Sequence, residues 1–576
     1  MTNKELAEIF TLIADLMQIK GEVIYKILAY RKAAENLLSL PRAAKDIWEE
    51  GKLEEIPGVG KAIAEKIDEM LRTGKLNFLE KLAEEVPASL AGVLAVPDLG
   101  PKKVKLFWDQ LGITSIDELK AAAQEDKLAG LPGMGKKSQD KILEGIEALS
   151  RRSGRLPLGD AWELAQEQLA FLRGLPNVSQ VEAAGSLRRM RSTIGDIDIL
   201  AASDDPEPVM EAFASQPEVA RVEGRGSTKT SVEFNSGLRA QLWVHPIKKF
   251  GTALQYATGS KDHNVKLREL ALSKGYSLSE HALTDKDGTE LFCAGEQEVY
   301  QRLGIAWVPP ELREDRGEVE AAKNGELPRL IEQGDILGDL HTHSTWSDGK
   351  ATIREMAAEA VKRGYRVLAI TDHSQSLGIA NGLSIERLAQ QKKEIALVQE
   401  EIGGRLLLLH GTEMEIKADG SLDYPDEVLA GLDIVIASLH VSIRQDRQQV
   451  TERVLNAIHN PHVDMIGHLT NRLIPEREGA DLDMDKVLAA AAEMDTVLEI
   501  NANPRRLDLE DIYARRAAAM GIKLAINTDA HRPEQLDLLQ FGIGTARRGW
   551  VQKEDVINTW EPEKLVSWLQ KRGAAV

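Results

Sequence analysis

The sequence of 576 residues contains a single cysteine, Cys293. A framework of intramolecular disulfides is therefore excluded, and this scarcity of cysteine is typical of a protein that works in a reducing compartment. The chain also lacks any apolar run long enough to cross a membrane, and its first residues do not form a charged-then-apolar signal segment. We therefore expect a cytoplasmic protein that has no membrane partner.

An excess of basic residues is also missing. The formal net charge is −19 at pH 7, and the acidic excess is shared between the two halves of the chain. A general electrostatic attraction to nucleic acid is therefore absent, so any DNA-binding role must rest on local groups of residues. The length favours several domains, each with enough chain for a core of its own.

Histidine and acidic residues recur at the ends of apolar, strand-like runs in the C-terminal part. His341 and His343 lie two residues apart after one such run, so their side chains point to the same face of a strand. Similar groups end further runs, as in 371–373, 410–413 and 527–531. The carboxyl ends of strands in an α/β barrel converge on one mouth. Because imidazole and carboxylate bind divalent metals, the pattern predicts a metal centre there.

From about Ile336 to the C-terminus the chain resembles the PHP family, named after polymerases and histidinol phosphatase. The resemblance implies a distorted seven-stranded (β/α) barrel that holds up to three divalent metals, Mn²⁺ or Zn²⁺, and hydrolyses phosphoesters with a metal-activated hydroxide. Asp348 stands where some members have a histidine, which Mn²⁺ would tolerate. The metal ligands that the resemblance implies are His341, His343, Asp348, His373, Glu413, His440, His468, Asp529 and His531.

A glycine-containing pattern occurs three times in the N-terminal part, which reads as almost wholly helical. The copies span 56–61, 96–102 and 131–136, and each precedes an expected helix. Paired glycines there let backbone N–H groups face a phosphate, and a lysine follows. The copies resemble helix-hairpin-helix motifs, which bind the DNA backbone. The middle copy, with Asp98 in place of the first glycine, is expected to bind weakly or only to support the fold. The implied DNA-binding residues are Gly58, Gly60, Lys61, Gly133, Gly135 and Lys136.

Two acidic residues lie on an apolar strand in the middle of the chain. Asp196 and Asp198 share one face of that strand and can bridge two Mg²⁺ or Mn²⁺ ions. Upstream, Gly185 and Ser186 let the backbone and a hydroxyl reach nucleotide phosphates. Together these elements resemble the nucleotidyltransferase palm of X-family DNA polymerases, in which the two aspartates are catalytic. The nucleotide-binding residues that the resemblance implies are Gly185, Ser186, Arg189, Tyr256, Gly259 and Asn264.

The palm departs from the family pattern at one position. The third metal-binding aspartate of the family falls on Gln241, whose amide brings no charge and cannot accept a proton from the primer hydroxyl. Losing one such electrostatic group commonly costs about a hundredfold in rate. We therefore expect low polymerase activity with a preference for Mn²⁺. Glu233, on an adjacent strand, is a candidate substitute.

Lys66 is a candidate nucleophile in the N-terminal region. Segments 29–34 and 64–69 resemble the small N-terminal domain of X-family polymerases. In some members the matching lysine forms a Schiff base with an abasic sugar and releases 5′-deoxyribose phosphate. A lysine on an exposed helix is more often only a solvated charge, so both interpretations stay open.

The two resemblances together cover nearly the whole chain, which is similar to bacterial X-family DNA polymerases with a C-terminal PHP domain. The predicted fold is multidomain, with all-helical domains followed by α/β domains. The expected boundaries are 1–85 for a helical, lyase-like DNA-binding domain, 86–152 for fingers with helix-hairpin-helix motifs, 153–242 for the palm, 243–315 for the thumb, 316–334 for a linker and 335–576 for the PHP domain.

We expect a DNA-repair enzyme, of the kind used in base excision repair, that fills short gaps. Its partners would be gapped or nicked DNA and deoxynucleoside triphosphates, and its PHP domain would act as a 3′→5′ exonuclease. The protein itself would be a monomer. Candidate phosphate-gripping residues are Arg444, Arg472 and Arg505. Two alternatives remain open. The palm is an inactive scaffold that delivers DNA to a PHP nuclease, or the PHP site hydrolyses a small phosphomonoester.

Overall fold

The computed structural model describes residues 1, 3–38, 40, 42–96, 99–151 and 155–574. It divides into two compact units, 1–153 and 154–576. Asp98 of the middle glycine pattern and residues 152–154, at the expected boundary between fingers and palm, lie outside the described residues. Within the described part of the chain, no helix combines the length and apolar character needed to cross a membrane.

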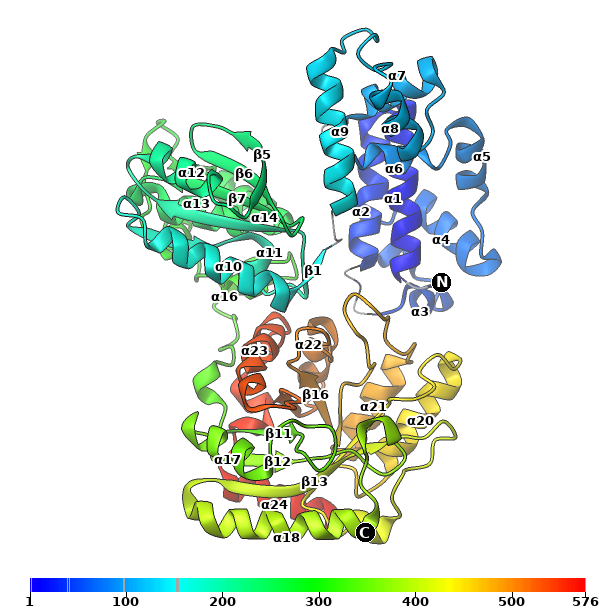
Figure 1. Ribbon diagram of the computed structural model, residues 1–576, viewed down its shortest axis with the longest axis vertical. Helices are drawn as coiled ribbons and strands as arrows, with labels where there is room; N and C mark the ends of the chain where they lie inside the picture. Colours follow the sequence, from blue (N-terminus) through cyan, green and yellow to red (C-terminus); the bar gives the residue numbers. More distant parts are fainter. Residues whose placement is uncertain (2, 39, 41, 97–98, 152–154, 575–576) are drawn as a thin grey trace. The chain divides into compact units, whose positions relative to one another are not determined.

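The first unit is helical, as predicted. Helices α1 and α2 lie side by side (Figure 1) and bury Phe10, Ile13 and Leu16 in a core that extends through the unit. The helices are α1 (Asn3–Lys20), α2 (Ile24–Leu38), α3 (Ala44–Glu49), α4 (Lys61–Thr73), α5 (Asn77–Glu85), α6 (Leu90–Leu94), α7 (Pro101–Leu111), α8 (Ile116–Gln124) and α9 (Lys136–Arg151).

The second unit begins with a five-stranded sheet in the order β2-β4-β7-β6-β5. Strand β4 is parallel to β7 and antiparallel to β2, so the acidic strand lies inside the sheet. The elements are β1 (Leu156–Pro157), α10 (Leu158–Arg173), β2 (Gln180–Ala183), α11 (Gly185–Arg188), β3 (Thr193–Ile194), β4 (Asp196–Ala202), α12 (Pro206–Ala214), β5 (Val219–Arg225), β6 (Lys229–Phe234) and β7 (Arg239–His245).

A smaller helical region with a three-stranded sheet follows the palm sheet. The segment expected as a linker, 316–334, contains helix α16, and its buried Glu318 lies 2.7 Å from Nδ1 of the buried His263. That helix therefore packs into the preceding region. The elements are α13 (Phe250–Thr258), α14 (Lys261–Ser273), β8 (Ser277–Leu278), β9 (Leu283–Thr284), β10 (Glu290–Leu291), α15 (Glu296–Arg302) and α16 (Glu318–Asn324).

The C-terminal region is the predicted seven-stranded parallel barrel, with strands in sequential order from β11 to β17. A parallel bridge between Thr342 and Ala530 brings the first strand to the chain that follows the last. The strands are continuous apolar runs because both of their faces are buried, and helices such as α18 cover the outside (Figure 1). The strands are β11 (Gly338–Thr342), β12 (Val367–Ile370), β13 (Leu407–Glu415), β14 (Ile434–Ser438), β15 (Met465–Ile466), β16 (Val497–Asn501) and β17 (Leu524–Asn527).

Helices connect these strands and form the outer layer of the barrel. Two of them begin at Ile353 and Ile385, each after a Ser or Thr N-cap whose side chain accepts a hydrogen bond from a backbone N–H of the first turn. The helices are α17 (Ile353–Lys362), α18 (Ile385–Ile402), α19 (Asp426–Leu429), α20 (Arg447–His459), α21 (Met484–Met494), α22 (Asp511–Ala519), α23 (Leu539–Arg548) and α24 (Pro562–Ala574).

Candidate functional site

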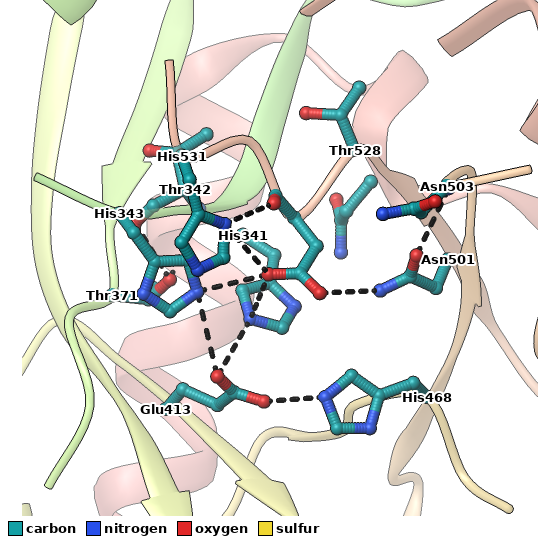
Figure 2. A network of polar contacts seen from close by, with 12 residues as sticks. His341, Thr342, His343, Thr371, Glu413, His468, Asn501, Asn503, Thr528 and His531 are labelled. Atoms are coloured by element: carbon teal, nitrogen blue, oxygen red, sulfur yellow. Dashed lines mark hydrogen bonds and ion pairs between the residues drawn. The ribbon is translucent and has the colours of Figure 1, made fainter. Parts of the chain in front are cut away.

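The predicted ligands of the barrel converge at the carboxyl ends of its strands. Eight of the nine fall into three groups, and within each group the candidate ligand atoms lie within 4.8 Å of one another. The ninth, His468, places Nε2 at 2.7 Å from Glu413 Oε1. Figure 2 shows Glu413 reaching His468 with one oxygen and His341 and His343 with the other. The groups are His343, Asp348, His373 and His531; His341, His343, Glu413 and Asp529; and His373, Glu413 and His440.

Many of the candidate metal-binding atoms in this cluster are buried and lie close to one another, but they form no hydrogen bond among the described residues. They include both ring nitrogens of His343 and His468, both carboxylate oxygens of Glu413 and Oδ1 of Asp529. Burying polar atoms without partners costs several kcal/mol each in an apolar medium, so such a cluster needs a ligand. Imidazole nitrogen and carboxylate oxygen suit Mn²⁺ or Zn²⁺, and the donor set therefore fits divalent metals.

The electrostatics of the cluster keep its carboxylates ionised. Burial would raise the pKa of Glu413, but the surrounding histidines, led by His440, lower it well below its ordinary value. Burial would likewise lower the pKa of His440, but Glu413 and Glu415 raise it to about 9. The cluster therefore presents an ionised acceptor at the junction of the three groups.

Two carboxylates that were not predicted from the sequence orient the imidazole rings of two candidate metal ligands. Glu499 Oε1 lies 2.7 Å from His341 Nδ1, and Glu415 Oε2 lies 2.7 Å from His440 Nδ1. Each contact directs the opposite ring nitrogen toward Glu413, at 3.3 Å for His341 and 3.2 Å for His440. Glu415 could have been predicted from the sequence, because it lies two residues after Glu413 on β13 and so shares the same face of the strand.

The three arginines expected to grip phosphate differ in their surroundings. Arg472 pairs with Glu510 at 2.8 Å. Arg505 and Arg444 are both exposed, and Arg505 pairs with Glu476 at 2.8 Å. An arginine that the sequence analysis did not single out is closer to the cluster, because Nε of Arg506 lies 3.7 Å from Asp529 Oδ2.

In the palm, Asp196 and Asp198 lie on one face of β4, and Gln241 lies opposite Asp198 in the parallel pairing with β7. Gln241 Nε2 donates a hydrogen bond to Asp196 Oδ2 at 2.7 Å. Burial and the neighbouring Asp196 raise the pKa of Asp198 to about 7. Two carboxylates so placed repel one another unless a cation or proton is present, so the pair fits a divalent metal.

Glu233 does not lie beside Gln241. The antiparallel register places Ser231 opposite Gln241, and Glu233 lies opposite Arg239. Glu233 is fully buried, and its Oε2 lies 3.8 Å from Arg221. The carboxylate is therefore not positioned to replace the missing aspartate.

The predicted nucleotide-binding residues lie in two segments, one at α11 and one from α13 to α14. Gly185 has φ +59°, and a Cβ there would lie 2.0 Å from Asp198 Oδ2, so only glycine fits. Ser186 follows on the same helix. Arg189 donates to the carbonyl of Thr258, immediately before Gly259. Farther along, Asn264 Nδ2 donates to the carbonyl of Tyr256 at 2.8 Å. The structure thus brings the two sequence segments together.

The first glycines of the two complete patterns have the same backbone φ. Gly58 and Gly133 both have φ +74°, and the second glycines, Gly60 and Gly135, directly precede helices α4 and α9. Gly60 is the N-cap of α4, which has no side-chain cap.

The lysines near these loops differ. Lys61 and Lys136 are both exposed, and Lys136 is paired with Asp126. Lys66, the candidate nucleophile, donates to the carbonyl of Ala62 at 3.0 Å and lies 4.9 Å from the centre of the Phe78 ring. These contacts hold the amine against its own helix and a neighbouring ring.

Paired aspartates in a palm, helix-hairpin-helix patterns and a cluster of candidate metal ligands in a (β/α) barrel are together typical of a phosphoryl-transfer enzyme that binds DNA. Four family profiles match the chain: a helix-hairpin-helix domain over 1–76, a SAM-like helix-hairpin-helix tandem over 90–148, a DNA polymerase beta thumb over 253–314 and a PHP domain over 339–503.

Relatives extend the similarity to the full length. The DNA polymerase/3′-5′ exonuclease PolX of Bacillus subtilis is 40% identical over 576 residues, covering 99% of this chain and 100% of that protein. Rat DNA polymerase lambda is 27% identical over 345 residues, 54% of this chain and 56% of that protein. A probable phosphatase of Thermoanaerobacter is 33% identical over 249 residues, 41% of this chain and 96% of that protein. The chain belongs to the X-family DNA polymerases that carry a PHP domain.

Proposed function

We propose that this chain fills short DNA gaps at its palm and removes nucleotides from 3′ ends at its PHP barrel. The observation that carries the proposal is the presence of two separate acidic sites in one chain, the Asp196–Asp198 pair and the cluster around Glu413. The full-length similarity to a polymerase and exonuclease supports the same pairing of activities.

At the barrel, the predicted ligands would hold up to three divalent metals, Mn²⁺ or Zn²⁺. When bound, such metals supply a water-derived nucleophile at neutral pH and neutralise phosphate charge. Glu499 and Glu415 orient the rings of His341 and His440. Arg506, beside Asp529, adds a fixed positive charge that suits a phosphate.

At the palm, Asp196 and Asp198 would hold Mg²⁺ or Mn²⁺, which neutralises the triphosphate when bound. The start of α11, with Gly185 and Ser186, offers backbone N–H groups and a hydroxyl to that triphosphate. Gln241 supplies no third charge, so this site would be weak in Mg²⁺. The backbones at Gly58 and Gly133 suit contact with DNA phosphates, which supports gapped or nicked DNA as a partner.

One observation favours a second candidate function, in which the palm is an inactive DNA-binding scaffold. The amide of Gln241 donates to Asp196, so the glutamine uses an oxygen that a metal would need. A third candidate, hydrolysis of a small phosphomonoester, is favoured by the similarity of a probable phosphatase to 41% of this chain.

A comparison of three substrates tests the barrel's part of the proposal. The purified chain in Mn²⁺ is given a 5′-labelled single strand, a 3′-phosphorylated strand and p-nitrophenyl phosphate. Stepwise shortening of the first strand, with release of nucleoside monophosphates, supports the exonuclease. Hydrolysis of p-nitrophenyl phosphate without any shortening would favour the small-substrate candidate.

A further inference from the structure

Arg548, the last residue of barrel helix α23, joins the barrel to the palm. Its side chain is only 4% exposed. Nη1 donates to the backbone carbonyl of Arg189 at 2.7 Å and to Glu314 Oε1 at 2.9 Å, and Nη2 donates to Asp511 Oδ2 at 2.9 Å. One buried guanidinium therefore contacts the loop after α11, the end of the thumb region and the barrel itself.

Glu314 extends this contact to the side chain of Arg189. The same carboxylate accepts from Arg189 Nε at 3.2 Å and lies 3.7 Å from Arg191 Nη1. Burial would raise the pKa of Glu314, but Arg548, Arg189 and Arg191 together lower it to about 2. Three cations thus surround one carboxylate, and the side chain of Arg189 is fixed by a partner that Arg548 itself holds.

Apolar packing reinforces the same contact. Helix α23 approaches the loop so closely that a Cβ at Gly544 would lie 2.6 Å from Met190 Cε and 3.0 Å from Met190 Cβ. Phe541, on the same helix, and Leu507 are buried in the hydrophobic core of the palm. The barrel therefore packs against one side of the segment 185–191.

We propose that Arg548 of the barrel is a positioning residue for nucleotide binding at the palm. It fixes the backbone of Arg189 directly and the guanidinium of Arg189 through Glu314. The inference rests on the proposed function of the palm, because Arg189 is an expected ligand of the nucleotide. Removing one acceptor from a buried, paired cation costs considerable stability, so the contacts of Arg548 form together. We therefore expect the loop after α11 to keep one favoured arrangement only while Arg548 is present.

The test compares Arg548→Met and Arg548→Lys with a matched control, Arg363→Met. Arg363 pairs with Glu359 and Asp537 elsewhere on the barrel. In Arg548→Met, Glu314 still has Arg189 as a partner, and Asp511 still pairs with Arg316 at 2.9 Å. Neither carboxylate is therefore left without an arginine. Gap filling is measured against nucleotide concentration in Mn²⁺. Hydrogen–deuterium exchange of 185–191 is measured in parallel, and hydrolysis of bis-p-nitrophenyl phosphate reports on the barrel.

Arg548→Met is expected to raise the KM for the nucleotide about tenfold with a smaller change in kcat, and to speed exchange in 185–191. Arg548→Lys should recover part of both effects, and the control should match the wild type. Unchanged exchange and a KM within about twofold of wild type in Arg548→Met would overturn the inference.

Two further outcomes are also decisive. If the wild type adds no nucleotide in either metal, the proposed polymerase function fails, and exchange in 185–191 alone decides the coupling. If Arg548→Met also loses bis-p-nitrophenyl phosphate hydrolysis, Gly544→Val replaces it, because that change pushes α23 from Met190 and keeps every charge. Unaltered exchange and KM in Gly544→Val would then contradict the inference.

Discussion

Gln241 and Asp196 form a direct contact in the palm, with the Gln241 amide donating to Asp196 Oδ2 at 2.7 Å. The glutamine lies at the position where the polymerase family has its third acidic residue. The palm therefore has two carboxylates and one amide facing the same space, and one carboxylate oxygen is engaged by that amide. This contact gives a physical reason to expect low activity.

Gln241→Asp should increase gap filling. A third carboxylate would add charge for a metal and a group that can accept a proton, a gain on the order of a hundredfold in kcat. The measurement is single-turnover extension of a gapped duplex in Mg²⁺ and in Mn²⁺. Gln241→Asn, which shortens the side chain without adding charge, is the control. Equal rates for the wild type and Gln241→Asp would show that the palm lacks more than this one carboxylate.

Glu499→Gln should weaken the barrel site without affecting the palm. The carboxylate lies 2.7 Å from His341 Nδ1, and losing such a partner commonly lowers metal affinity or activity about 10–100-fold. The measurement is 3′-end shortening as a function of Mn²⁺ concentration, where a higher metal requirement is expected. Glu493→Gln, an exposed glutamate on α21, is the control. Identical metal dependence in the Glu499 variant would refute the orienting role.

The sequence predicted the candidate ligands of the barrel better than the carboxylates that orient them. Candidate ligands such as His343 and Asp529 could be grouped from the sequence because strand ends converge in a parallel barrel and alternate residues share a face. Glu499 could not be assigned to His341 in the same way, since 158 residues separate them. Such a pairing depends on which strands become neighbours, and local patterns do not contain that information.

The contact between palm and barrel was also beyond sequence reasoning. Arg548 and Arg189 are 359 residues apart, and an arginine at the end of a helix normally reads as a surface charge. The packing of the segment 316–334 was not expected for a related reason, because its charged residues suggested a linker. In the structure, Glu318 is buried against His263, so the charge marks a buried pair.

Acid should loosen the contact between palm and barrel. Glu314 has a pKa lowered from 4.5 to about 2, so its stabilising contribution is fully present above pH 4.5 and is lost as the pH falls towards 2. Glu314→Gln should therefore lower the Tm at pH 6, and the difference from wild type should shrink towards pH 3. Glu401→Gln, at an exposed pair with Arg354, is the control. A difference that is constant with pH would contradict the assignment.

The glycine loops should matter for binding DNA. Gly133 has φ +74°, which a side chain tolerates poorly, so Gly133→Ala should distort the turn that presents N–H groups. We expect a several-fold weaker affinity for a gapped duplex, measured by fluorescence anisotropy at fixed salt. Gly112→Ala is a matched control, because Gly112 has φ +67° at the end of α7, outside the glycine patterns. Equal losses in both variants would indicate general unfolding instead.

If the palm and the barrel are independent sites, each can be inactivated without loss of the other. A labelled gapped duplex is incubated with the wild type, Asp196→Ala and His341→Ala, in Mg²⁺ and in Mn²⁺, with and without deoxynucleotides. We predict that extension is lost only in Asp196→Ala and that shortening is lost only in His341→Ala. Shortening without any extension by the wild type in either metal would contradict the polymerase assignment and leave a DNA-guided nuclease.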